Sequence, residues 1–186
     1  MTGKVHSTAG IVFGVGSILL LNYVATETML GFSVNPDFAN FVQIKEGTEV
    51  IFDTGLTNCM AIFAGSFLGS LLPDIDHPTS TASKKMFIFS IPYRILQFIF
   101  GKFKSTKHFV GHRGITHSLL FMFIPLCLMF FVLSSPFWKA AMFGLTVGIF
   151  SHLFMDMLNP HGVPLFMPFA KKTFRLLPKK LCIRTK

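Results

Sequence analysis

Four apolar stretches dominate this sequence, and each is close to the roughly 20 residues that an α-helix needs to cross the hydrocarbon core of a bilayer. They cover residues 5–25, 55–72, 115–133 and 137–158. The composition agrees, because 51% of the residues are hydrophobic, 24 are phenylalanine and 13% are charged, which is about half the charged fraction of a typical soluble domain. We therefore expect an all-α membrane protein, a four-helix transmembrane bundle that forms a single membrane-embedded domain over residues 1–186.

Charge is distributed unevenly among the segments that connect these stretches. The net charge is +9, yet the acidic residues outside the motifs described below gather in residues 26–54, where there is one lysine. The basic residues gather in residues 73–114 and in a basic C-terminal tail, 171–186. The positive-inside rule then places the acidic loop outside and both termini in the cytoplasm. Membrane orientation explains this segregation better than nucleic-acid binding, so we expect no nucleic-acid partner.

Two further segments are apolar but are not expected to span the bilayer. Residues 86–103, "MFIFSIPYRILQFIFGKF", are interrupted by Pro92 and Arg94, and we expect an interfacial helix there. Residues 162–169, "GVPLFMPF", are a second candidate interfacial element. The three cysteines, Cys59, Cys127 and Cys182, are far apart, so the sequence indicates neither a disulfide framework nor a thiolate metal site.

Ionisable residues converge on one end of the expected bundle. In the topology above, each of the four spans has candidate ligands at or next to its cytoplasmic end, and the outer half has none. Such groups in a membrane bundle usually mark a functional site because they are expensive to bury. The residues are His6, Asp74, Asp76, His77, His112, Arg113, His117, His152 and Asp156.

The spacing within each motif indicates how these side chains approach one another. In "SHLFMD", His152 and Asp156 are four residues apart and share a helix face, so both can reach one ion, or Asp156 can instead orient His152. In "GHRGITHS", Gly114 can interrupt the helix, so His112 is expected to approach from a loop. In "PDIDHP", two prolines stiffen a turn that aims carboxylates at the mouth of the bundle.

Histidine nitrogens combined with carboxylates favour zinc, manganese or iron over magnesium or calcium. The candidate set exceeds one tetrahedral shell, so we expect one or two divalent transition-metal ions, with zinc or manganese favoured, and two-metal sites commonly hydrolyse phosphate esters. That no metal binds, and that these groups only form structural hydrogen bonds, remains open. His108 and His161 are expected to be loop histidines. The candidate metal ligands are His6, Asp74, Asp76, His77, His117, His152 and Asp156.

Three of these motifs, "LLPDIDHP", "FVGHRGITHSLL" and "SHLFMDMLNPHGVPLFMPF", resemble the YdjM-like family of bacterial inner-membrane proteins. "GKVHSTAG" and "KKTFRLLP" fit the same pattern, so the resemblance covers about residues 1–30, 60–80 and 109–178 and leaves out the long acidic loop and the tail. It implies a multi-pass protein of the bacterial inner membrane and a metal-dependent hydrolase, without a substrate. A looser likeness, in residue order and type only, links the early histidine, an aspartate and the late HxxxD to zinc-dependent phospholipase C and related zinc nucleases.

Two functions follow as hypotheses. The first is a hydrolase with its site at the cytoplasmic interface, where a metal activates water and the substrate is a phosphate-containing lipid or similar amphiphile. Arg113 and His112 are its candidate catalytic residues, and Arg113 would clamp an anionic oxygen. Arg113 could instead reach lipid headgroups or bridge Asp74 or Asp76.

The second hypothesis is a non-enzymatic membrane protein, either a regulator that binds a partner or a metal conduit. A conduit needs polar groups through the membrane. Thr57, Asn58 and Thr146 are uncharged candidates for that role, and the lack of charge among them counts against transport. Protein partners of a regulator remain open.

Overall fold

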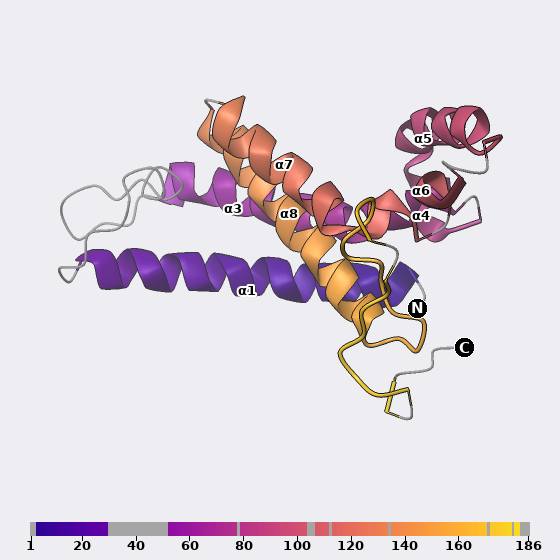
Figure 1. Cartoon of the computed structure of the whole chain (residues 1–186). Helices are drawn as coiled ribbons and strands as arrows, with labels where there is room; N and C mark the ends of the chain where they lie inside the picture. Colours follow the sequence, from indigo (N-terminus) through magenta and orange to yellow (C-terminus); the bar gives the residue numbers. More distant parts are fainter. Residues whose placement is uncertain are drawn as a thin grey trace.

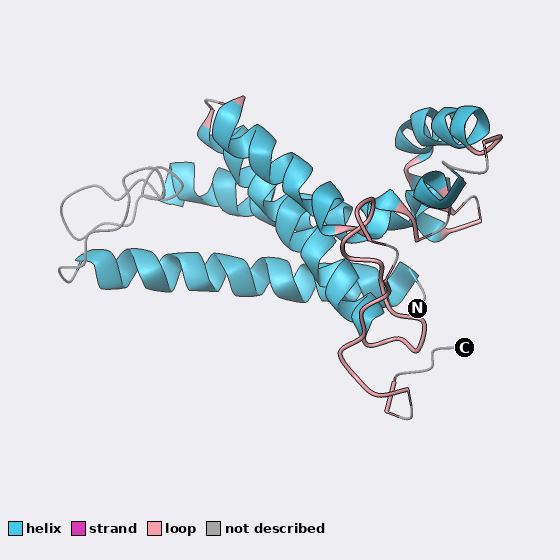
Figure 2. Ribbon diagram, in the orientation of Figure 1, coloured by secondary structure: helices cyan, strands magenta, loops and turns pink. Residues whose placement is uncertain are grey.

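The computed structural model describes residues 3–29, 52–77, 79–103, 107–111, 113–133, 135–170, 172–179 and 181–182. These residues form helices joined by turns, with one isolated β-bridge between Val163 and Phe174 (Figures 1 and 2). The expected all-α class of membrane protein is confirmed. The helices are α1 (Gly3–Met29), α3 (Phe52–Leu71), α4 (Thr81–Lys85), α5 (Phe87–Phe100), α6 (Lys107–Val110), α7 (Leu119–Phe131) and α8 (Pro136–Met157), with 3₁₀ helices η1 (Leu72–Asp76) and η2 (Ile115–His117).

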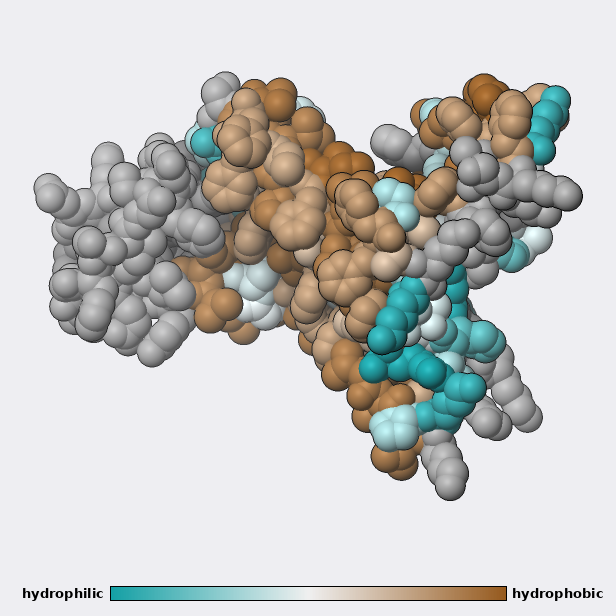
Figure 3. Space-filling view, in the orientation of Figure 1, coloured by the Kyte–Doolittle hydropathy of each residue, from teal (hydrophilic) through white to brown (hydrophobic). Residues whose placement is uncertain are grey.

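Three helical segments are long and apolar enough to cross a membrane: Gly3–Leu21, Leu56–Asp76 and Pro136–Met157. Hydrophobic side chains cover the outside of the bundle, where Figure 3 is mostly brown. The remaining expected span, 115–133, differs. Its helix α7 has 13 residues, about 20 Å, which is shorter than a hydrocarbon core of about 30 Å.

The shorter α7 has a local cause. The Ser118 hydroxyl accepts a hydrogen bond from the Phe121 backbone N–H, so Ser118 is the N-cap and the helix begins one residue later. The three residues before the cap turn inward as η2, with Thr116 and His117 buried. The structure therefore has three or four apolar helices of membrane type, and α7 lies against α8 (Figure 1).

Helices α3 and α8 cross in close backbone contact at the centre of the bundle (Figure 1). A Cβ atom on Gly69 would clash with the carbonyl oxygen of Leu145, and one on Gly148 would clash with that of Ser66. Helix α1 joins this pair through the Ser66 hydroxyl, which donates to the Gly10 carbonyl across 2.6 Å. Small residues thus hold three helices together where lipid supplies no hydrophobic driving force.

The two segments expected at the interface differ from each other. Residues 86–103 contain helix α5, as expected, and α4–α6 lie apart from the bundle beyond one end of α3 (Figure 1). Residues 162–169, the second candidate interfacial element, contain the bridging residue Val163 and turns, and no helix. Pro164 and Pro168 lack the N–H groups that a helix needs, and the Leu165 carbonyl accepts instead from the Leu119 N–H at the start of α7.

Candidate metal centre

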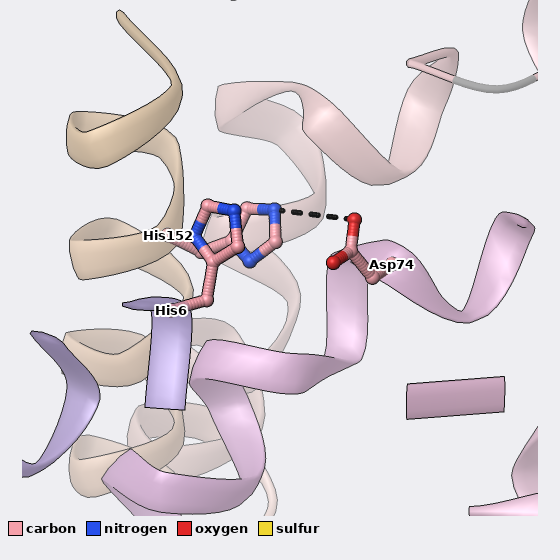
Figure 4. Close-up of side chains that lie close together, drawn as sticks. All are labelled: His6, Asp74 and His152. Atoms are coloured by element: carbon pink, nitrogen blue, oxygen red, sulfur yellow. Dashed lines mark ion pairs between the residues drawn. The ribbon is translucent and has the colours of Figure 1, made fainter. Parts of the chain in front are cut away.

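Five of the predicted ligands come together from four elements of the fold. His6 lies near the start of α1, Asp74 on η1 and His117 on η2, while His152 and Asp156 lie one turn apart on α8. They form two overlapping groups, His6–Asp74–His152 and His117–His152–Asp156, within each of which the possible ligand atoms lie within 4.8 Å of one another. Figure 4 shows the first group, with His152 facing the Asp74 carboxylate. We call these five residues the metal centre, because their possible ligand atoms are close enough together to hold an ion.

The end of α3 fixes the orientation of His152. Pro73 follows the helix, whose last four carbonyls have no partner within it. One of them, the Ser70 carbonyl, lies 2.6 Å from His152 Nδ1. A carbonyl can only accept, so Nδ1 carries a proton, and Nε2 is the nitrogen left to bind an ion. That Nε2 lies 3.7 Å from Asp74 Oδ1 and 3.8 Å from Asp156 Oδ2.

A second chain of hydrogen bonds orients His117. The Thr116 hydroxyl donates its proton to Asp76 Oδ2 across 3.0 Å. The hydroxyl oxygen of Thr116 lies 3.1 Å from His117 Nδ1; its own proton goes to Asp76, so it must accept from the ring, and Nδ1 is again protonated. His117 Nε2 then faces Asp156 Oδ2 at 3.7 Å and Asp74 Oδ1 at 3.9 Å. Asp76 therefore acts on the centre through Thr116 and His117 and does not join either group of ligand atoms.

His6 completes the buried core of the centre. Its ring stacks on that of His152, with centroids 3.8 Å apart, and its Nε2 lies 3.6 Å from Asp156 Oδ1. Within the described part of the chain, His6 Nδ1 and His152 Nε2 are buried and have no hydrogen-bond partner. Buried polar atoms without a partner are rare and costly. A cation between imidazole nitrogens and carboxylates would satisfy such atoms.

Asp156 links the centre to two residues outside it. Its Oδ1 accepts a 2.8 Å hydrogen bond from Asn159 Nδ2, and its Oδ2 lies 3.6 Å from Arg113 Nη2. Asn159 and Thr116 were not among the site residues predicted from the sequence. Both lie inside the quoted motifs, and the signal that could have identified them is a polar residue next to a candidate ligand or one helical turn from it.

Arg113 occupies a special backbone position at the rim of the centre. Its φ of 61° is rare for a residue other than glycine. This conformation lets its N–H donate to Asp76 Oδ2 across 2.9 Å, while Nη1 donates to the Gly162 carbonyl across 3.3 Å. The side chain pairs with Asp156, whereas the sequence had suggested Asp74 or Asp76 as bridging partners. The anion between this cation and the histidines is therefore a carboxylate of the protein itself.

Exposure identifies where the centre opens. The side chains of His6, His117, His152 and Asp156 are at most 4% exposed, whereas those of Asp74 and Arg113 are 16% and 22% exposed. A ligand from outside would meet these two residues first.

The other predicted residues lie away from the centre or outside the description. His77 belongs to neither group, and its Nδ1 lies 3.0 Å from the Thr79 hydroxyl. His112, a candidate catalytic residue, lies outside the described residues, and so does the side chain of His108. His161 is exposed on the loop after α8.

Comparison with known proteins extends the motif resemblance over nearly the whole chain. The family model described as YdjM inner membrane protein matches residues 1–181. The chain belongs to the YdjM family. The match includes the acidic loop and most of the basic tail, which the motifs alone left out, and it agrees with apolar helices that need a lipid bilayer.

Curated relatives of this YdjM family member are identical to it at about one residue in three of the matched region. Inner membrane protein YdjM of Escherichia coli (strain K12) is 35% identical over 117 residues, which is 62% of this chain and 53% of the relative, and YdjM of Shigella flexneri gives the same values. Protein YvsG of Bacillus subtilis (strain 168) is 36% identical over 106 residues, 56% of each chain. The matched region thus spans about half the length of these relatives. No solved structure matches.

Proposed function

We propose that this YdjM family protein is a membrane-bound metal-dependent hydrolase whose centre faces the cytoplasmic surface of the bacterial inner membrane. The observation that carries the proposal is the arrangement of His152 and His117. Each has its Nδ1 proton fixed by an oxygen acceptor, so each presents Nε2 to the same two carboxylates inside a buried site. Outer partners that fix the tautomer in this way are typical of histidine metal ligands.

The donor set suits a divalent transition metal, with zinc or manganese favoured over magnesium. Such an ion supplies Lewis acidity and lowers the pKa of a coordinated water. His6, Asp74, His117, His152 and Asp156 would hold it. Because His152 belongs to both groups of ligand atoms, the centre is suited to one ion or to two neighbouring ions. Asp76, Thr116 and Asn159 would keep the ligands in position.

The rim of the centre supports an anionic substrate. Arg113 is a partly exposed cation beside the buried ligands, and its guanidinium has more N–H donors than its contacts with Gly162 and Asp156 use. A phosphate-containing lipid or similar amphiphile offers such an anion at the depth of the headgroups. Asp74 is partly exposed as well, so one carboxylate of the centre is accessible to a reacting group.

Arg113→Lys tests the role of this cation. Lysine keeps the charge but cannot make the planar fork of a guanidinium. We expect bound metal and membrane insertion to be retained and turnover to fall by at least about 10-fold, the scale of one lost charge-assisted hydrogen bond. Metal content and turnover are measured on the same preparation. Unchanged turnover would remove Arg113 from substrate binding, and loss of metal would assign it a structural role through Asp156.

The hydrolase itself is tested on purified full-length protein in lipid nanodiscs. The protein is loaded with zinc or manganese and assayed for headgroup release from a panel of phospholipids and for hydrolysis of a soluble phosphate ester. We expect metal-dependent turnover of at least one substrate, lost in Asp74→Asn and kept in His161→Ala, the matched histidine on an exposed loop. Metal binding without turnover on any of them would favour a non-enzymatic regulator.

The proposed orientation makes a separate prediction. We expect residue 40 to lie outside the membrane and residue 186 to lie in the cytoplasm, because the acidic and basic segments separate by loop. Topology reporters fused at these two positions should give opposite signals. Matching signals would contradict the arrangement of four spans with both termini inside.

The alternative of a metal conduit has little support along α8. The Thr146 hydroxyl, one of the polar groups expected to line a conduit, donates to the Met142 carbonyl of its own helix across 2.9 Å. It is therefore already satisfied locally.

A further inference from the structure

On helix α5 the polar side chains face the protein and the apolar side chains face outward, which is the reverse of a helix on the surface of a soluble protein. A narrow stripe faces the rest of the chain: Ser90 is fully buried, and Tyr93 and Gln97 are half-buried. The surface away from that stripe is apolar and exposed, and Figure 3 is largely brown over this helix. Its exposed hydrophobic residues are Phe87, Ile88, Ile91, Ile95, Leu96, Phe98, Ile99 and Phe100.

The inward stripe holds two segments that lead into the metal centre. Gln97 Nε2 donates to the Asp76 carbonyl across 2.9 Å and to the Val110 carbonyl across 2.8 Å. The Tyr93 hydroxyl donates to the same Val110 carbonyl across 3.3 Å. Burial, with the nearby Asp76 carboxylate as the second cause, raises the pKa of Tyr93 to about 12, so the hydroxyl remains a donor. Asp76 ends η1, and Val110 lies three residues before Arg113.

The exposed side of α5 requires an apolar environment. A contiguous apolar surface of this size is not left in water by a stable protein. The helix has 14 residues, about 21 Å, so it is too short to cross a hydrocarbon core of about 30 Å. It lies apart from the bundle beyond the end of α3 that carries the metal centre (Figure 1). At that end of a membrane-spanning helix, the apolar environment available to α5 is the lipid at the surface of the bilayer.

The end of α5 adds charge that suits a lipid surface. Lys102 follows the helix and is exposed, and its Nζ lies 4.3 Å from the centroid of the Phe98 ring. A lysine whose stem follows an apolar side chain can place its ammonium among the headgroups while that side chain remains in the acyl region. Anionic headgroups of the cytoplasmic leaflet would attract it.

We propose that α5 is seated in the boundary between the headgroups and acyl chains of the cytoplasmic leaflet, and that Gln97 couples this seat to the two segments that bear Asp76 and Arg113. The metal centre then opens at headgroup depth. The seat itself is independent of the proposed function. What rests on the proposed function is the consequence for substrate: a molecule with its polar head at Arg113 and its apolar part in the leaflet beside α5.

A single tryptophan placed on α5 can measure the seat. The chain has one tryptophan, Trp138 at the start of α8, so Trp138→Phe gives a silent background. Ile95→Trp then reports from the exposed side of α5, and His161→Trp reports from an exposed loop as the matched control. The full-length variants are reconstituted in vesicles of phosphatidylcholine and phosphatidylglycerol.

We expect Ile95→Trp to be quenched several-fold more strongly by lipids brominated near the headgroup than by aqueous acrylamide, and His161→Trp to show the reverse. Strong acrylamide quenching of Ile95→Trp would overturn the proposal. Shielding from both quenchers would also overturn it, in favour of a protein cover such as a second copy of the chain, which cross-linking of Ile95→Cys would then detect. None of these readouts needs a metal or a substrate.

The coupling through Gln97 has its own test. Gln97→Met keeps the size of the side chain but removes both N–H donors, so the two site-bearing segments lose their common anchor. We expect zinc affinity in nanodiscs, measured by competition with a chromophoric chelator, to fall several-fold, while Ile95→Leu on the opposite side of α5 leaves it unchanged. An unchanged affinity in Gln97→Met would overturn the coupling. If the wild type bound no zinc, the proposed function would fail and the depth measurement would still decide the seat.

Discussion

His152→Ala is expected to abolish transition-metal binding by the purified protein. His152 belongs to both groups of ligand atoms, and its Nε2 lies within 3.8 Å of the carboxylates of Asp74 and Asp156. Loss of an outer partner of a ligand weakens metal affinity by roughly 10–100-fold, so loss of a shared ligand should exceed that range. Metal content is measured by elemental analysis of protein purified from membranes, together with a chelator titration of thermal stability.

Two variants serve as matched controls for this result. His161→Ala removes an exposed histidine and should leave metal content unchanged. Asp76→Asn removes no ligand but weakens the contacts with Thr116, His117 and the Arg113 N–H that support the centre, so affinity should fall by about 10–100-fold while some metal remains bound. Wild-type protein whose stability ignored chelators would contradict the centre, and so would a His152→Ala variant that kept its metal.

Gly148→Ala is expected to destabilise the bundle although it adds a single methyl group. The new Cβ would clash with the Ser66 carbonyl on the facing helix, and it lies near the backbone of Gly69 and Ser70 as well. Backbone atoms cannot rotate out of the way as a side chain can, so α3 and α8 must move apart. Overpacking typically costs 1–3 kcal/mol, and we expect about 3 kcal/mol or more here.

The matched control is Gly16→Ala on α1, where a Cβ would meet no atom within 4 Å. Alanine favours a helix over glycine by about 1 kcal/mol, so this variant should be neutral or slightly stabilising. Both are compared by thermal unfolding monitored by size-exclusion chromatography in detergent. Equal stability of the two variants would show that the α3–α8 contact is looser than the structure indicates.

The hydropathy and charge of the sequence were enough to predict the class of the fold and the end of the bundle where the ligands gather. Both depend on patterns that extend over many residues, so the conformation of a single turn does not change either prediction. The length of α7 was not predictable in the same way. The apolar run from residue 115 resembles one continuous helix. In the structure Ser118 is the N-cap, so α7 begins after it, and the preceding residues form η2 with Thr116 and His117 buried.

The choice between Asp74 and Asp76 also lay beyond the sequence. Both belong to one short motif, and both are carboxylates beside a proline-stiffened turn. In a 3₁₀ helix with about three residues per turn, residues two apart point in different directions. Asp74 therefore faces His152, while Asp76 turns to the Arg113 N–H and the Thr116 hydroxyl. Only the three-dimensional path of η1 separates a ligand candidate from the residue that supports it.

The distribution of the centre over the chain has a consequence for biosynthesis. Its first residue, His6, leaves the ribosome long before its last, Asp156, and each of α1, η1, η2 and α8 contributes at least one side chain. No shorter nascent chain can assemble the full set, so an ion would be captured only after α8 has entered the membrane and packed against α3. A ligand that binds only the finished arrangement stabilises that arrangement and no earlier state. Metal capture would then act as the closing step of insertion, and it would distinguish a completed molecule from a stalled one.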